Sequence, residues 1–137
     1  MASAIGIGLA LLTALFARAT GLDRDRAFYP TVLIVSASYY VLFAIMGGST
    51  RAVLVESLGL AGFAALAVVG FRRNLWLVVA ALVGHGAFDF VHSRLVTNPG
   101  VPAWWPAFCL AYDIALAGVL AWLVSRSHLT SRSFGPR

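Results

Sequence analysis

Long apolar runs separated by short polar breaks fill most of the chain. An α-helix needs about 20 mostly apolar residues to cross a hydrocarbon core of about 30 Å. Five runs approach this length, and they predict helices at about 2–17, 31–48, 52–71, 75–96 and 106–125. The breaks are polar or turn-rich, as in the Gly-Gly-Ser-Thr-Arg segment at 47–51. We therefore expect a single transmembrane domain at 1–126 and a disordered cytoplasmic tail at 127–137.

Composition supports a membrane protein and excludes an additional soluble domain. The 137 residues are 61% hydrophobic and 11% charged, with a mean hydropathy of +0.88. Soluble domains carry roughly 25% charged residues. Lipid accepts only helices or closed barrels, and the apolar runs are far longer than barrel strands. The expected fold class is therefore all-α, a bundle of five transmembrane helices.

The basic residues predict the orientation of this bundle. All ten are arginine, and only Arg51 and Arg94 fall on one side of the predicted spans. The other eight lie in the first loop, the third loop and the tail, at Arg18, Arg24, Arg26, Arg72, Arg73, Arg126, Arg132 and Arg137. Cytoplasmic loops carry the excess of positive charge. The N-terminus is thus expected on the outer side and the C-terminus on the cytoplasmic side of a bacterial inner membrane. The net charge of +5 is expected to interact with anionic lipid headgroups and not with nucleic acid.

The first run resembles a secretory signal peptide at one point only. Residues 17–19 read Ala-Arg-Ala, like a cleavage site. A signal peptide begins with a basic region, however, and no basic side chain precedes Arg18. The sequence therefore favours a retained helix.

Ionisable residues in the fourth run indicate where function lies. His85, Asp89 and His92 are spaced i, i+4 and i+7, so they share one helix face. Placing such groups in hydrocarbon costs several kcal/mol, and they usually mark a ligand site or a pathway. At about 1.5 Å per residue, Glu56 and Asp113 reach a similar depth on neighbouring helices. The predicted pocket opens to the outer side, and its further lining residues are Ser36, Tyr39, Tyr40, Arg94, Cys109 and Tyr112.

One interpretation of this polar layer is a site for a single divalent metal ion. The Asp-x-x-His spacing resembles the Glu-x-x-His pairs that hold metals inside helical bundles. The expected ligands are Glu56, Asp89, His92 and Asp113, and the expected catalytic residues are His85 and Asp89. Two other interpretations stay open: a proton-sharing network of carboxylates and imidazoles, and hydrogen bonds that only fasten helices together.

The polar pattern also resembles a family of small bacterial multi-pass membrane proteins classed as a domain of unknown function. The resemblance covers roughly residues 52 to 122 and rests on Glu56, His85-x3-Asp89-x2-His92, Asn98-Pro99, Pro102, Pro106, Cys109 and Tyr112-Asp113. Phe88 stands where the family often has Trp, and Ser93 replaces the second histidine of a His-His pair. The resemblance implies that these residues form one site. Because Ser93 replaces a histidine, a metal site here has one candidate ligand fewer than in the family. The resemblance implies no activity.

The sequence names no reaction. It contains no phosphate-binding loop, dinucleotide fingerprint or nucleophile elbow, so we expect no nucleotide cofactor. The favoured hypothesis is a pocket that binds a metal or small polar ligand, with hydrolytic or redox chemistry on a lipid-like substrate. The alternative is a small transporter or an assembly subunit. Whether the chain turns over a substrate, forms a homo-oligomer or binds a partner membrane protein stays open.

Overall fold

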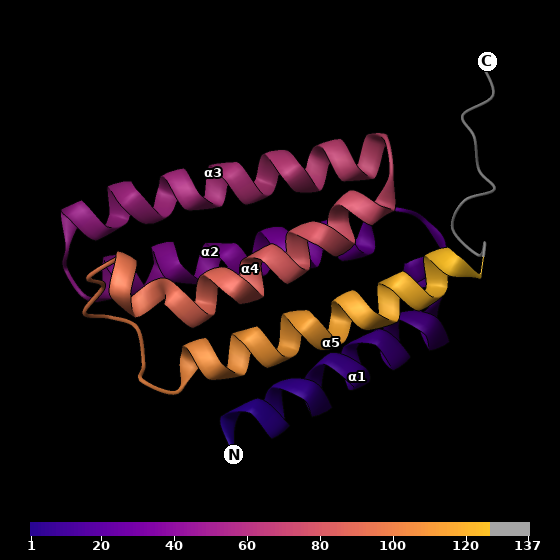
Figure 1. Ribbon diagram of the computed structural model, residues 1–137, viewed down its shortest axis with the longest axis horizontal. Coiled ribbons are helices and arrows are strands. Elements are labelled where there is room, and N and C mark those ends of the chain that lie inside the picture. Colours follow the sequence, from indigo (N-terminus) through magenta and orange to yellow (C-terminus); the bar gives the residue numbers. More distant parts are fainter. Residues whose placement is uncertain (127–137) are drawn as a thin grey trace.

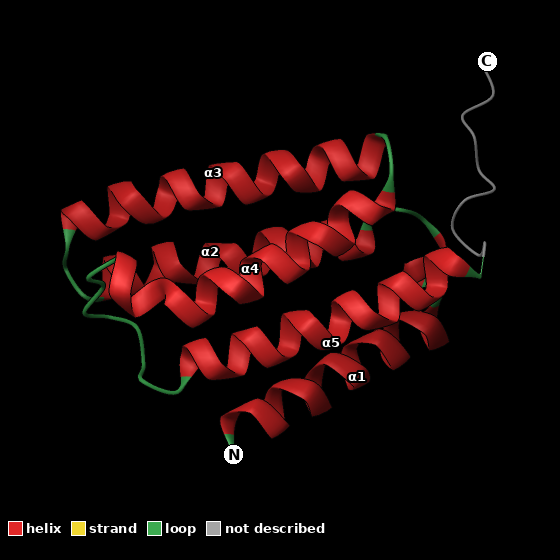
Figure 2. Ribbon diagram, in the orientation of Figure 1, coloured by secondary structure: helices red, strands yellow, loops and turns green. Residues whose placement is uncertain are grey.

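The computed structural model describes residues 1–126, and within them the chain is helical (Figure 2). The helices of this range are α1 (Ala2–Thr20), the short 3-10 helix η1 (Leu22–Arg24), α2 (Phe28–Met46), α3 (Thr50–Arg72), α4 (Leu75–Leu95) and α5 (Trp105–Ser125). All five α-helices are long and apolar enough to cross a membrane. The prediction of an all-α protein with five candidate spans is confirmed. The tail at 127–137, predicted to be disordered, lies outside the described residues.

The first polar break is shorter than the sequence pattern suggests. α1 continues three residues past the predicted end at 17, and stops where Gly21 adopts a left-handed conformation with φ 80°. α2 begins at Phe28 instead of 31, because Pro30 fits in the first turn, where its missing N–H needs no partner. The other helix ends coincide with the prediction or differ by one or two residues. The hydrophobic pattern locates each apolar segment, whereas the residues at its two ends determine where the helix begins and stops.

α2, α4 and α5 form the centre of the bundle, and α1 and α3 flank it on opposite sides (Figure 1). α5 packs between α1 and α4, and α4 also contacts α3 and α2. α1 meets α5 through a ridge of small residues, Gly6, Ala10, Ala14 and Ala17, all buried. A side chain at Gly6 would overlap the carbonyl group of Phe108. Small residues thus let these two backbones approach closely.

The outward faces of α1 and α3 are rich in large apolar side chains. Leu12 and Leu15 of α1 and Leu58 of α3 are more than half exposed. Such faces can contact lipid chains without a free-energy cost, whereas their contact with water is unfavourable. The apolar core lies between the inner faces of the helices and contains Leu33, Leu82 and other leucine side chains. Both the core and the outer surface are therefore apolar, so the buried polar residues stand out.

The loop between α4 and α5 folds back onto the end of α2. A Cβ atom at Gly100 would overlap the carbonyl oxygen of Phe43, and one at Gly47 would crowd the backbone of Gly100. Only glycine permits this backbone contact. The contact holds Asn98, two residues earlier, against the interior of the bundle, where its amide bonds the carbonyl of Tyr40.

Candidate functional site

Two packed helices bring four potential metal ligands together. α4 contributes His85 and Asp89, and α5 contributes Cys109 and Asp113, each pair spaced i, i+4 on the face that meets the other helix. One ligand atom from each residue lies within 4.8 Å of the others, and all four side chains are buried. We call these four residues the ligand group.

Contacts within the ligand group centre on the imidazole of His85. Its Nδ1 lies 2.5 Å from Oδ2 of Asp113 and 3.5 Å from Oδ2 of Asp89. The thiol of Cys109 donates to the same Asp113 oxygen at 3.8 Å. Among the described residues, His85 Nε2, Asp89 Oδ2 and Asp113 Oδ1 are buried and have no hydrogen-bond partner. Buried polar atoms are normally satisfied, so this group has unused bonding capacity.

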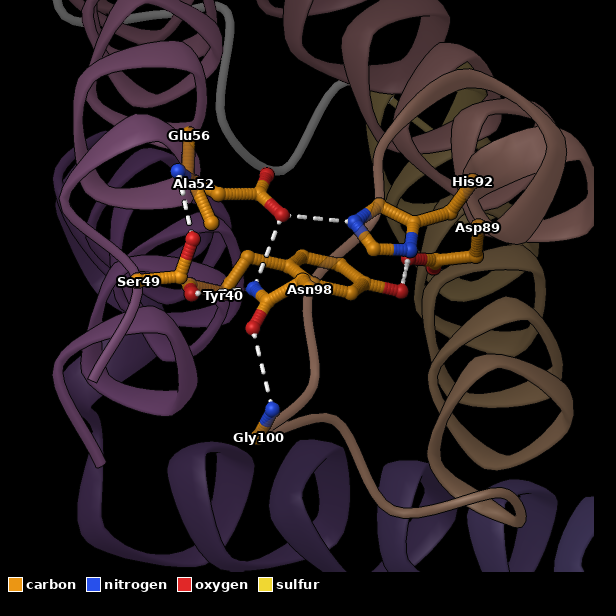
Figure 3. Close-up of polar contacts among 8 residues, drawn as sticks. All are labelled: Tyr40, Ser49, Ala52, Glu56, Asp89, His92, Asn98 and Gly100. Carbon is orange, nitrogen blue, oxygen red and sulfur yellow. Dashed lines mark hydrogen bonds and ion pairs between the residues drawn. The ribbon is translucent and has the colours of Figure 1, made fainter. Parts of the chain in front are cut away.

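A second polar cluster lies beside the ligand group and is built differently. Nε2 of His92 on α4 donates to Oε1 of Glu56 on α3 at 2.7 Å, and the Asn98 amide donates to the same oxygen at 2.9 Å (Figure 3). Because the Glu56 carboxylate only accepts, Nε2 carries the proton when the ring is neutral, which leaves Nδ1 with a lone pair. We call this cluster the Glu56–His92 pair. Asn98 is its positioning residue.

Tyr40 of α2 joins the two clusters. Its hydroxyl donates to Oδ1 of Asp89 at 2.6 Å. Its ring stacks on the imidazole of His92 with ring centres 4.0 Å apart. Figure 3 shows the phenol lying across the space between α3 and α4, with the hydroxyl at Asp89. Tyr40 thus orients Asp89 through a hydrogen bond and His92 through ring contact.

The structure divides the predicted metal ligands between these clusters. Asp89 and Asp113 belong to the ligand group, whereas Glu56 and His92 form the neighbouring pair. α3 and α5 pack against α4 from different directions, so Glu56 and Asp113 do not meet. His85, predicted as a catalytic residue, lies inside the ligand group, and Cys109, predicted only as a lining residue, joins it.

Two cavities border the clusters. The larger, about 740 Å³, lies between α4, α5 and the loop that joins them, and Asp89 and His92 are among its lining residues. The smaller, about 430 Å³, lies between α1, α2 and α5 and is lined by four of the predicted pocket residues, Ser36, Tyr39, Cys109 and Tyr112. Arg94 is exposed and lines neither of these two cavities. The ligand group is therefore bordered by one cavity through Asp89 and by the other through Cys109.

Asn98 is absent from the site residues predicted from helix spacing, although the family resemblance includes it. The Asn-Pro pair predicts a turn, and Gly100 N–H does donate to the Asn98 side chain as such a turn requires, at 3.3 Å. The same side chain also reaches Glu56 through the folding of the loop onto α2. Its position just after the helix that carries His92 and its place in the family resemblance are the sequence signals for this contact.

Comparisons with protein-family models, with curated proteins and with solved structures give no match. The resemblance to a family of small bacterial membrane proteins stays a prediction.

Proposed function

We propose that this chain is a multi-pass membrane protein that binds one divalent transition-metal ion at the ligand group. The observation that carries the proposal is the convergence of four buried ligand atoms, from His85, Asp89, Cys109 and Asp113, within 4.8 Å of one another. The unused bonding capacity of His85, Asp89 and Asp113 supports it. The proposal changes the sequence-based ligand set by exchanging Glu56 and His92 for His85 and Cys109.

The donor set favours zinc or a similar ion. Zinc takes four ligands from imidazole, thiolate and carboxylate groups, in a tetrahedral arrangement with bonds of about 2.0–2.3 Å. Calcium and magnesium prefer six or more oxygen ligands, which these four residues do not supply. Charge balance points the same way, because Asp89 and Asp113 place two carboxylates beside a single imidazole in a buried site. A dication offsets their charge.

The proposed orientation places the N-terminus outside and the C-terminus in the cytoplasm of a bacterial inner membrane. In support, six arginines of the described residues lie at one end of the bundle and two lie at the other. The six are Arg18, Arg24, Arg26, Arg72, Arg73 and Arg126, and the two are Arg51 and Arg94. With the arginine-rich end inside, the larger cavity and the Glu56–His92 pair lie toward the outer surface.

The reaction class that fits this site best is metal-assisted hydrolysis of a lipid-like substrate. With three of the four residues as ligands, a bound zinc-type ion would keep one position for water, and it would supply Lewis acidity and activate that water. His92, oriented by Glu56, faces the larger cavity beside Asp89 and would accept a proton there. The apolar wall of that cavity would hold the hydrocarbon part of the substrate.

Elemental analysis of protein purified in mild detergent, without chelator or His-tag, tests the proposal. We expect about one metal ion per chain in wild type, from the single ligand group, and loss of the ion in Cys109→Ala and Asp113→Asn. Glu56→Gln and His92→Gln serve as matched controls, because both residues are buried and polar but lie outside the ligand group.

The four variants also separate the two ligand sets. Metal loss in His92→Gln with retention in Cys109→Ala would restore the set predicted from sequence and overturn this one. Folded, metal-free wild type that does not take up added zinc would overturn both.

A proton-handling role is the second candidate, and one observation favours it. Tyr40, Asp89, His85 and Asp113 form a series of polar contacts of 2.5–3.5 Å across the bundle. Such a series can share and pass protons. This role predicts metal-free protein whose liposomes show proton flux that is abolished by Asp89→Asn. An assembly role would instead appear as loss of a co-purifying partner in that variant.

A further inference from the structure

The loop between α1 and α2 meets the end of α3 at one end of the bundle (Figure 1). Arg26 of this loop donates from Nη2 to the carbonyl oxygen of Gly70 at 3.4 Å. Gly70 lies in the last turn of α3, where carbonyl groups have no partner within the helix. The contact therefore holds the head of Arg26 within about one helical turn of Arg72 and Arg73, the positions at which α3 ends.

The two loops at this end carry more positive charge than their own acidic residues neutralise. Arg18 pairs with Asp23 at 3.5 Å, which leaves Asp25 as the other carboxylate of the first loop. Within residues 1–126, no ion pair is formed by the remaining arginines of the two loops, namely Arg24, Arg26, Arg72 and Arg73. These arginines outnumber Asp25, so an anion at this end of the bundle meets a net positive charge.

The guanidinium groups have hydrogen-bond donors left for such an anion. Each guanidinium carries five N–H groups in a fixed fork. Arg26 is half-buried and bonds Gly70 through one nitrogen, and Arg72 and Arg73 are exposed. Guanidinium forks match the oxygens of a phosphate and bind them in pairs. Phosphate is therefore the anion that fits this group best.

Apolar side chains beside the arginines favour a phosphate that belongs to a lipid. Val69 on α3 and Leu77 on α4 are 43% and 39% exposed. The two helices pack closely here, since a Cβ atom at Gly70 would lie 3.4 Å from Cβ of Leu77. Trp76 is also exposed, and tryptophan is enriched at the level of lipid headgroups. One phospholipid can thus contact the arginines with its head and the apolar residues with a chain.

We propose that an anionic phospholipid binds where these two loops meet, with its phosphate at Arg26, Arg72 and Arg73 and an acyl chain along Val69 and Leu77. The site shares no residue with the ligand group, so it goes beyond the proposed metal and does not depend on it. Basic pockets between helices on the cytoplasmic side of a membrane recognise anionic headgroups. General attraction to anionic lipid requires only charge, whereas this site requires arginines from two loops.

Native mass spectrometry of the detergent-solubilised protein tests this proposal, with phosphatidylglycerol and phosphatidylcholine of identical chains as probes. We expect wild type to retain one phosphatidylglycerol several-fold more strongly than phosphatidylcholine. The double variant Arg72→Gln, Arg73→Gln should weaken this retention by about fivefold for each arginine removed. Both residues are exposed, so the variant should fold as wild type does. Arg26→Gln, which keeps a donor for the Gly70 carbonyl, should also weaken retention.

The double variant Arg51→Gln, Arg94→Gln is the matched control. It removes the same charge from two exposed arginines at the other end of the bundle, so retention should stay at the wild-type level. An equal loss in both double variants would show attraction to overall charge and would overturn the site.

Two further measurements test the chemistry of the ligand. Arg72→Lys, Arg73→Lys keeps the charge and removes the guanidinium forks, so we expect several-fold weaker retention than in wild type. Full retention would overturn the role of the forks. Inorganic phosphate at millimolar concentration should leave the phosphatidylglycerol bound, and its displacement by phosphate would overturn the choice of a lipid.

Discussion

The ligand group and the Glu56–His92 pair are neighbouring polar clusters that share α4 and differ in how far their atoms are satisfied. In the pair, Oε1 of Glu56 accepts two hydrogen bonds, and Asn98 is engaged on both sides of its amide. In the ligand group, three polar atoms of the described residues have no partner. A satisfied network fixes geometry, whereas an unsatisfied one has capacity for a ligand. The difference fits the proposed function, in which one cluster positions side chains and the other binds the ligand.

Removing a carboxylate from the ligand group should have the largest effect on stability. Asp113→Ala leaves the buried imidazole of His85 without its closest partner, and loss of one member of a buried pair costs about 3–5 kcal/mol. Titration of unfolding with SDS in mixed micelles measures this. Asp25→Ala, in an exposed loop, should cost about 1 kcal/mol or less. An equal loss in both variants would show that the ligand group is not the more sensitive region.

Glu56→Ala should destabilise the protein less than Asp113→Ala does. It removes the acceptor of both His92 and Asn98, at a cost of about 2–3 kcal/mol. The cavity beside His92 admits water that can replace part of the lost bonding. The same unfolding titration measures the loss. A larger loss than in Asp113→Ala would reverse the comparison between the two clusters.

Gly100→Ala should disturb the Glu56–His92 pair and spare the ligand group. The new Cβ would overlap the Phe43 carbonyl, and overpacking of this kind costs about 1–2 kcal/mol. Hydrogen exchange should accelerate in the loop that carries Asn98, while metal content stays unchanged. Gly118→Ala, in open space on α5, is the control, and it should be neutral or stabilise by up to about 1 kcal/mol. Metal loss in Gly100→Ala would show that the clusters act as one site.

Tyr40→Phe should destabilise the protein by about as much as Gly100→Ala does. It deletes the hydroxyl that donates to Asp89 but keeps the ring on His92, and one hydrogen bond to a carboxylate contributes about 1.5 kcal/mol or more. A double-mutant cycle with Asp89→Asn isolates the link between the clusters. Additive effects of the two substitutions would show that Tyr40 does not couple them.

The helices could be predicted from hydrophobicity because each span must satisfy its own backbone in lipid. Details that depend on local geometry could not. Pro30 reads as a helix boundary but lies in the first turn of α2, and Gly21 ends α1 through a left-handed conformation. The sequence shows which residues are compatible with a turn but not which turn forms.

Candidate site residues could be selected from sequence, but not sorted into clusters. Counting along the helices brings Asp89 and Asp113 to similar depth, and the structure places both in the ligand group. Depth does not give the direction from which each helix approaches α4, so Glu56 could not be separated from Asp113. The i, i+4 spacing of Cys109 and Asp113 was the available signal for including the thiol.

The hydrogen-bond partners of Glu56 come later in the chain than Glu56 itself, and this order matters for membrane insertion. His92 and Asn98 both follow Glu56, on α4 and the next loop, so α3 leaves the ribosome ahead of the segments that carry the donors to its carboxylate. α3 also has the highest hydropathy of the five helices, 2.2 over its best window. Because acidic groups within a span oppose insertion, the leucine- and valine-rich remainder of α3 offsets that cost and carries Glu56 into lipid ahead of its partners.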